Sequence, residues 1–407
     1  MTSGPTLSLK TPIRFRAVWW SVLLTAQSIL FVQAPLHADE RKLDLTPFSD
    51  GTDDWRTRQL FTGALVTFYG QFSPAILNYD DGALGRTYAP VGNSNKTSRL
   101  GLRWHIRQLG SWSPIFRAEI GVTPRPSNSV NLNTSQNVDW LADETNLRKL
   151  ELILKHPRLG VLTFGQGSMA TDSITEVDYS GTKVAAYSDV AAVASAQFLR
   201  FADGTLSIAQ LGEFIDNFEG SNITGTYADG DRKMRARYDS PEFNGLIFSA
   251  AIGNEVLHDD GGTNADAALT YERDLGDYKF ASGIGYSWKP DARVLSGSMS
   301  GLHKASGLNL TVAVGGQDDG GDFSYVKLGL LRSYWAVGET ALSIDFYQGN
   351  DIYSAGSRSR SVGLAFVQSF DRLNVQGFAL LRRYSFDARD ADFLDSTAMM
   401  TGLRWVF

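Results

Sequence analysis

The sequence predicts an all-β protein, a transmembrane antiparallel β-barrel of about 16 strands, and two features of the chain predict it. Segments of about ten residues alternate between apolar side chains and small or polar ones, and turn residues separate the segments. The connectors between them are alternately short and long, which is typical of barrels that cross a membrane. The composition agrees, because 407 residues with 40 Gly and only 20% charged residues suit one large all-β domain.

The clearest alternation lies in residues 278–288. One parity is almost entirely aromatic or aliphatic, and the other carries Lys, Ala, Gly and Ser. The same split recurs in residues 308–314 and 342–347. A soluble β-sandwich alternates too, with its apolar face turned to a core, so alternation by itself leaves both architectures open. The small residues of the polar parity and the connector lengths favour the membrane barrel.

The connectors divide into two sets by length. Short turns are expected at residues 110–113, 156–158, 241–243, 274–276, 304–306, 333–335 and 370–371. Longer loops are expected at residues 78–96, 124–145, 169–230, 255–264, 289–292, 317–321, 349–357 and 385–395. Successive hairpins turn at opposite ends of a barrel, so we expect the short turns at one end and the longer loops at the other.

The first 38 residues are typical of a secretory signal peptide. Lys10, Arg14 and Arg16 form a positive n-region, residues 17–32 form a mostly apolar h-region, and cleavage is expected after Ala38. The alternative is a single transmembrane anchor, which the short and polar-interrupted apolar stretch disfavours. The expected organisation is therefore a signal peptide (1–38), a polar leader (39–60) and a barrel (61–407), with export through the periplasm.

Composition excludes several classes of protein. The mean hydropathy of -0.17 is too polar for a bundle of transmembrane helices. A net charge of -6 without a long basic tract argues against nucleic acid as a partner. The chain has no cysteine, which excludes disulfides and thiolate metal sites. Asp- and Gly-rich stretches at residues 258–266 and 315–323 lack the spacing of a calcium loop, so we expect solvated acids there and no cofactor.

A basic ladder is the sharpest local pattern. Arg99, Arg103, His105 and Arg107 share one parity, and the other parity is Leu, Leu, Trp and Ile. A charge facing lipid near the midplane costs about 2–4 kcal/mol, so these cations are expected to face the lumen. The same argument applies to further basic residues that alternate with apolar ones, namely Arg235, Arg237 and Arg404. The alternative for any one of them is a solvated residue at a strand end.

The longest predicted loop, residues 169–230, exceeds the roughly 15 residues beyond which a loop is usually functional or disordered. Its acidic residues can lie opposite the basic ladder if the loop folds into the pore as a constriction: Asp172, Glu176, Asp178, Asp189, Glu213 and Asp216. Opposed charges then set a transverse field that orients polar solutes. The alternative is an extracellular cap with solvated acids. Residues 188–201 suit either a helix on the wall or a short strand pair.

Five stretches in order along the chain resemble the general (non-specific) trimeric porins of the Gram-negative bacterial outer membrane. They read VTFYGQFSPAILNYDDG, KTSRLGLRW, NLRKLELILKHPRLGVLTFGQGS, RKMRARYDSPEFNGLIFSAAIG and the terminal TGLRWVF. The resemblance covers most of the mature chain. It implies a homotrimer that contacts the lipid bilayer and lipopolysaccharide, and a water-filled channel for passive diffusion of small hydrophilic solutes and ions.

The resemblance also implies roles for particular residues. The basic pore-wall arginines of these porins fall on Arg99 and Arg148, and their loop after the fifth strand folds into the barrel as a constriction. Gly165 and Gln166 stand where these porins have Gly-Arg, so one wall charge is missing. Arg148 shares its parity with three leucines, which makes an inward orientation a departure from simple alternation.

Two alternative functions remain open at the level of the sequence. One is a substrate-selective channel of the same architecture, and the other is a non-transporting barrel that acts as an adhesin or a hydrolase. The mature histidines lie in no recognisable serine-hydrolase motif, so no enzyme is expected. Arginines opposite acids favour the general porin, and the physiological solute and ion preference are left undetermined.

Overall fold

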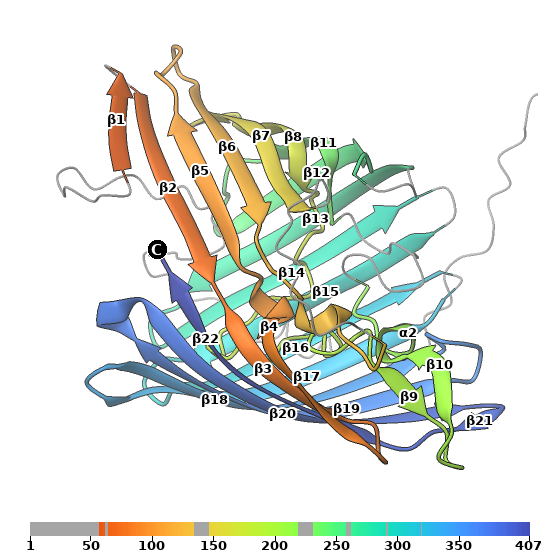
Figure 1. The fold of residues 1–407 in the computed structure, drawn as a ribbon. Coiled ribbons are helices and arrows are strands. Elements are labelled where there is room, and N and C mark those ends of the chain that lie inside the picture. Colours follow the sequence, from red (N-terminus) through yellow and green to blue (C-terminus); the bar gives the residue numbers. More distant parts are fainter. Residues whose placement is uncertain are drawn as a thin grey trace, which may run out of the picture.

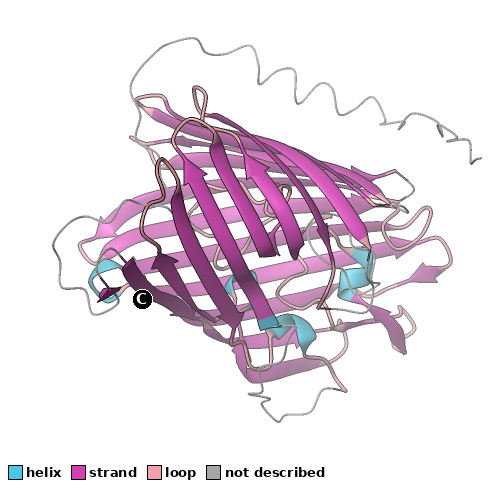
Figure 2. Ribbon diagram, turned by 90° about the horizontal axis from the view of Figure 1, so that it is seen from above, coloured by secondary structure: helices cyan, strands magenta, loops and turns pink. Residues whose placement is uncertain are grey.

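A computed structural model describes residues 57–61, 64–133, 146–218, 231–257, 262–289, 292–318 and 320–407. These residues form a closed antiparallel β-barrel of sixteen wall strands (Figure 1). Viewed from above, nearly all of the wall is strand, with only short helical turns (Figure 2). The expected signal peptide and most of the expected leader lie outside the described residues.

The wall strands are named here in the order in which they pair. They are β2 (Ala64–Phe72) continued by β3 (Pro74–Asp80), β5 (Arg99–His105), β6 (Ser113–Gly121), β7 (Leu147–His156), β8 (Gly160–Ser168), β11 (Arg232–Asp239), β12 (Leu246–Asn254), β13 (Thr263–Asp274), β14 (Tyr278–Trp288), β15 (Arg293–His303), β16 (Leu308–Gln317), β17 (Asp322–Trp335), β18 (Gly338–Asn350), β19 (Arg358–Phe370), β20 (Val375–Ala388) and β22 (Ser396–Val406). Pairing of β22 with β2 and β3 closes the barrel.

The remaining elements lie outside the sixteen wall strands, most of them in the connectors. They are β1 (Thr57–Phe61), β4 (Gly85–Gly92), β9 (Phe198–Arg200), β10 (Leu206–Gln210), β21 (Ala391–Asp392), the helix α2 (Leu211–Phe214) and the 3-10 turns η2 (Ser94–Lys96), η3 (Ser127–Ser129) and η5 (Asp371–Leu373). β1 pairs with β2, so the last residues of the predicted leader are part of the sheet. No helix in the described part of the chain is long and apolar enough to cross a membrane.

The apolar side chains of the strands point outward and the small ones point inward, as in a membrane barrel. β14 has the bounds predicted from the sequence, and its apolar residues Ile284 and Trp288 are exposed on the outer face. Its small residue Ala281 is buried on the inner face. A soluble sandwich buries its apolar face, whereas this wall turns its apolar face outward, as a barrel in a lipid bilayer does. The sandwich alternative is therefore excluded.

Most connectors lie close to the predicted residues, but the predicted loop at residues 78–96 contains the strand β4 and one predicted turn is displaced. The short turns lie at one end of the barrel and the longer loops at the other. β17 extends to Trp335, so the predicted turn at residues 333–335 lies within the strand and the turn is residues 336–337. Two connectors on the long-loop side, between β14 and β15 and between β16 and β17, have only four residues each.

A hydrophobic core lies inside the barrel on one side. The chain after β8 passes inside the wall, and its residues Val184 and Val193 are buried together with Phe323, Tyr325 and Tyr384 of β17 and β20. This core continues along β15–β20, β22, β3 and β4. Residues 188–201 contribute β9, part of a short strand pair with β10, and no α-helix. The inner faces of β5–β8 and β11, which carry most of the charge, lie outside the core.

Candidate functional site: the charged interior of the barrel

The basic ladder of β5 faces the interior over part of its predicted length. Arg99 and Arg103 are partly buried on the inner face, whereas Leu100 and Trp104 are exposed on the outer face. The Arg103 guanidinium carbon lies 4.5 Å from the centre of the Tyr69 ring. β5 ends at His105, so the alternation stops there. Arg107 lies in the connector to β6 and is exposed, and it does not extend the ladder across the wall.

Arg148 reaches the interior through an irregularity in the sheet. Lys149 pairs with Glu119 and Leu147 pairs with Ile120, which leaves Arg148 as one extra residue on β7. A bulge of this kind changes the direction of a side chain relative to simple alternation. Arg148 therefore turns inward although its parity is that of the leucines, and its Nε donates to Glu119 Oε1 at 2.8 Å.

Glu119 on β6 is the centre of a first charge cluster. Arg148 lies at 2.8 Å from it, and the Nε of Arg99 lies at 3.8 Å. The Tyr69 hydroxyl donates to its other oxygen at 3.0 Å. The carboxylate is buried, whereas the Arg99 and Arg148 side chains remain 28% and 20% exposed. The cluster thus has two cations for one carboxylate, and the cations are the groups that water and solutes reach.

A second cluster forms around Glu151 on β7. Its carboxylate accepts from Arg117 Nε at 2.5 Å and from Arg235 Nη2 at 2.5 Å. Arg235 also donates to the carbonyls of Ser168 and Gly165, at 2.9 and 2.7 Å, so it braces the end of β8. All three charged side chains are buried or nearly so. This cluster again carries one positive charge in excess.

A third cluster joins the wall to the inner loop. Glu176 lies 2.5 Å from Lys183 and 3.8 Å from Lys96, which belongs to η2 on the wall side. Burial, together with the nearby cations Lys183, Arg99 and Arg404, lowers the pKa of Lys96 to about 7. Two ammonium groups share one carboxylate here, as two guanidinium groups do in the clusters around Glu119 and Glu151.

Two further predicted basic residues point inward with other partners. Arg237 pairs with Asp239 at 2.7 Å and donates to the Met169 carbonyl at 2.5 Å, so it holds the start of the inner loop. Arg404 donates to the side-chain oxygens of Gln71 and Gln376, each at 3.0 Å. Both residues lie on the inner face of the barrel.

The six predicted loop acids have different surroundings. Glu176 and Asp172 keep partly exposed side chains. Asp178 is buried against Lys327 at 2.6 Å, and Asp216 is buried and accepts from the Phe218 amide at 2.6 Å. Glu213 accepts from the Gln210 amide at 3.1 Å and caps α2.

Asp189 remains the most unusual of the six. Its carboxylate accepts from the amides of Ala191 and Ala192 at 3.1 and 3.0 Å. Burial, and then the neighbouring carboxylates of Asp216 and Glu176, raise the pKa of Asp189 to about 7. The charge of this part of the loop therefore changes near neutral pH.

The inner loop is bonded to the wall along most of its described length. Asp266 on β13 accepts from the backbone of Ala170 and Thr171, and Ser298 on β15 accepts from the Val177 amide at 2.9 Å. Further along, Tyr384 on β20 donates to the Val190 carbonyl at 2.8 Å. These contacts place residues 169–218 against the inner face of the barrel.

Sequence reasoning missed Arg117, Glu119, Glu151 and Lys327. The alternation of Arg117 and Glu119 with apolar neighbours was visible in β6. Their partners were not, because pairing across strands depends on register. Among the described residues, no group of three His, Cys, Asp or Glu is arranged to hold a metal ion.

Comparisons with known proteins agree with this geometry. Residues 59–387 match a family model described as Gram-negative porin. The fold is similar to the anion-selective porin from Comamonas acidovorans (15% identity, TM-score 0.54, covering 84% of this chain and 100% of that one). It is also similar to in-vitro folded OmpT, an outer membrane protein of Vibrio cholerae (13% identity, TM-score 0.52, covering 85% of this chain and 98% of that one). A third similar structure is Salmonella typhi OmpF in complex with daunomycin (10% identity, TM-score 0.51, covering 86% of this chain and 100% of that one). A search among curated proteins finds no match.

Proposed function

This chain belongs to the Gram-negative porin family, and we propose that the channel it forms passes small anions more readily than cations. Family and fold make it an outer-membrane channel for passive diffusion of solutes, and they point to a channel rather than an enzyme. Selectivity in a water-filled pore depends on the charged side chains at its narrowest part. The proposal therefore concerns the balance of charge inside the barrel.

The observation that carries the proposal is the two-to-one ratio of cations to carboxylates. Glu119, Glu151 and Glu176 are each paired with two basic side chains. The three carboxylates are 13% exposed or less, and the cations around Glu119 and Glu176 are 20–28% exposed. The clusters around Glu119 and Glu151 each leave one positive charge in excess, and the cluster around Glu176 does so when Lys96 is protonated. An excess of positive charge raises the local concentration of anions in the channel.

We further propose that residues 169–218 narrow the channel. The hydrophobic core holds this loop against β15–β20, β22, β3 and β4, so we infer that solutes pass between the loop and the charged faces of β5–β8 and β11. Glu176 and Lys183 of the loop approach Lys96 of the wall side. Charges from loop and wall therefore act on the same passing solute.

The test is the reversal potential of the purified protein in a planar bilayer with a potassium chloride gradient. We expect current steps from single channels. We also expect a reversal potential with the same sign as the equilibrium potential of chloride. A reversal potential of the opposite sign would overturn the anion preference while leaving the channel itself in place. The same recording in sodium phosphate extends the test to a larger anion.

We propose that the protein assembles as a homotrimer. One of the similar structures is titled as a trimer form of OmpT. β5 has 7 residues and β18 has 13. At a rise of about 3.4 Å per residue and a tilt of about 40°, these lengths span about 18 and 34 Å, compared with an apolar band of about 25 Å. The wall at β5 is too short to span the apolar band, so its apolar outer face is better covered by a neighbouring protomer than by lipid.

Detergent-extracted protein tests the trimer. We expect the unheated sample to migrate far above the monomer on a gel and to collapse to it on boiling. Light scattering in mild detergent gives an independent mass, and a monomeric mass there would reject the assembly.

A further inference from the structure

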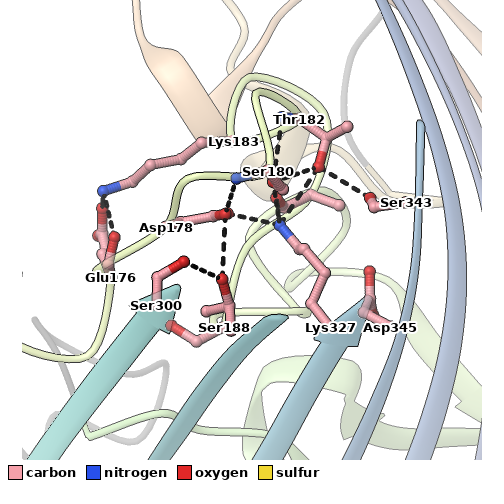
Figure 3. Close-up of polar contacts among 12 residues, drawn as sticks. Glu176, Asp178, Ser180, Thr182, Lys183, Ser188, Ser300, Lys327, Ser343 and Asp345 are labelled. Carbon is pink, nitrogen blue, oxygen red and sulfur yellow. Dashed lines mark hydrogen bonds and ion pairs between the residues drawn. The ribbon is translucent and has the colours of Figure 1, made fainter. Parts of the chain in front are cut away.

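A lysine on the barrel wall is completely buried beneath the inner loop. Lys327 on β17 donates to Asp178 Oδ2 at 2.6 Å and to the Ala186 carbonyl at 2.7 Å. The hydroxyls of Thr182 and Ser180 lie at 3.3 and 3.4 Å from the same nitrogen. Figure 3 shows the ammonium surrounded by these loop groups. One wall side chain thus contacts both ends of the loop segment 178–186.

The pairing on the wall explains why Lys327 is directed to the loop. Its direct neighbour across β17 and β18 is Asp345, an obvious partner by register. Arg382 on β20 already binds both oxygens of Asp345, at 2.7 and 2.9 Å, and all of these side chains are dry. Two aligned bonds from a guanidinium satisfy a carboxylate well. The free carboxylate for Lys327 is therefore Asp178 of the loop.

Neutral contacts hold the same segment from two sides. The Thr182 hydroxyl lies 2.8 Å from Ser343 of β18 and 2.8 Å from Ser180. On the opposite side, the Asn93 amide donates to the Val184 carbonyl at 2.9 Å. Lys183 lies between these two anchored positions, and its side chain extends away from Lys327 toward Glu176 (Figure 3).

We propose that Lys327 is a positioning residue for the channel: it clamps residues 178–186 to the wall and thereby fixes where Lys183 and Glu176 stand. The Lys327 ammonium is a fully buried charge, and its partners include acceptors of the loop. If the loop leaves the wall, the ammonium loses these acceptors. Leaving a buried charge unpaired is strongly unfavourable, which makes the loop position nearly all-or-none. This inference rests on the proposal that residues 169–218 narrow the channel.

The test compares Lys327→Met, Asp178→Asn and the double variant with Lys327→Arg. Each single neutral substitution leaves one buried charge without its partner, so these variants can lose stability for that reason alone. The double variant removes both charges and is the decisive one. We expect it to assemble like wild type by heat-dependent gel migration and to lose the single steady conductance level, with larger open-channel noise. Lys327→Arg should retain the steady level.

A second measurement follows the loop directly. The chain has no cysteine, so Lys183→Cys introduces a unique thiol for a spin label. We expect an immobile label in the wild-type background and a mobile one in the Asp178→Asn/Lys327→Met background. A label at Asp203→Cys, in the exposed turn between β9 and β10, is the matched control and should not change.

A steady conductance and an immobile label in the double variant would overturn the clamp. The wild-type reversal potential tests the anion preference separately. A mobile label together with an unchanged steady conductance would support the clamp and overturn the proposal that residues 169–218 narrow the channel, so the two proposals fail separately.

Discussion

Replacing Arg99 and Arg103 together with alanine should raise the cation preference and the conductance of the channel. Both guanidinium groups lie on the inner face of β5. Without Arg99, Glu119 keeps Arg148 at 2.8 Å and the Tyr69 hydroxyl at 3.0 Å, so the buried carboxylate remains satisfied. The double substitution is therefore expected to change the charge and width of the channel without unfolding the wall.

The magnitude follows from the two charges removed. For an ion about 8 Å away in water, a unit charge contributes about 0.5 kcal/mol. A Debye length of about 10 Å in 0.1 M salt reduces this to about 0.2 kcal/mol per charge. Two charges change the energies of an anion and a cation by about 0.5 kcal/mol in opposite senses, and with RT near 0.6 kcal/mol the anion-to-cation permeability ratio falls about fivefold.

The assay is the reversal potential in a planar bilayer at 0.1 M salt and again at 1 M salt. A Debye length of about 3 Å at 1 M should remove most of the difference between variant and wild type. Arg107→Ala with Arg158→Ala is the matched control, because it removes the same charge from exposed residues in the short turns. An unchanged reversal potential in the β5 variant, or an equal shift in the control, would refute the reasoning.

Three further predictions concern the loop, pH and export. Asp172→Asn with Glu176→Gln should shift the reversal potential toward greater anion preference, because it removes two negative charges from partly exposed residues of the loop. Lowering the pH from 8 to 6 should also increase anion preference, because the Asp189 carboxyl, with a pKa raised to about 7, loses its negative charge. Lys96, with a pKa lowered to about 7, gains a positive charge over the same range, so Asp189→Asn should weaken the pH effect rather than abolish it. Mass spectrometry of outer-membrane protein should find a mature N-terminus near Asp39, and a retained Met1 would contradict the cleavage.

The fold was predictable because a barrel wall follows a local rule. Alternation is set by neighbouring residues in the chain, so β14 was predicted with its observed bounds. The β5 ladder was predicted for the same reason, up to the strand end at His105. Arg148 shows where the rule stops: a bulge inverts the side chain, and it depends on the register with β6, which no local pattern reports.

The charge pairs were not predictable, because their members are far apart in the sequence. Lys327 and Asp178 are separated by 149 residues and meet only when the loop lies inside the barrel. The six loop acids were predicted as one class, yet Asp178 is buried in an ion pair and Glu213 caps a helix. A carboxylate in a sequence carries no mark of whether it will face solvent or be used in packing.

The same distinction explains why whole-chain charge does not predict the selectivity of such a channel. The chain has a net charge of -6, which taken alone suggests a preference for cations. Most of its acids are outside the three clusters, and Glu119 and Glu151 within them are buried beneath two basic side chains each. A passing ion responds to charges within about a Debye length. The proposed anion preference therefore rests on the local ratio of cations to carboxylates along β5–β7 and β11, and not on the net charge of the whole chain.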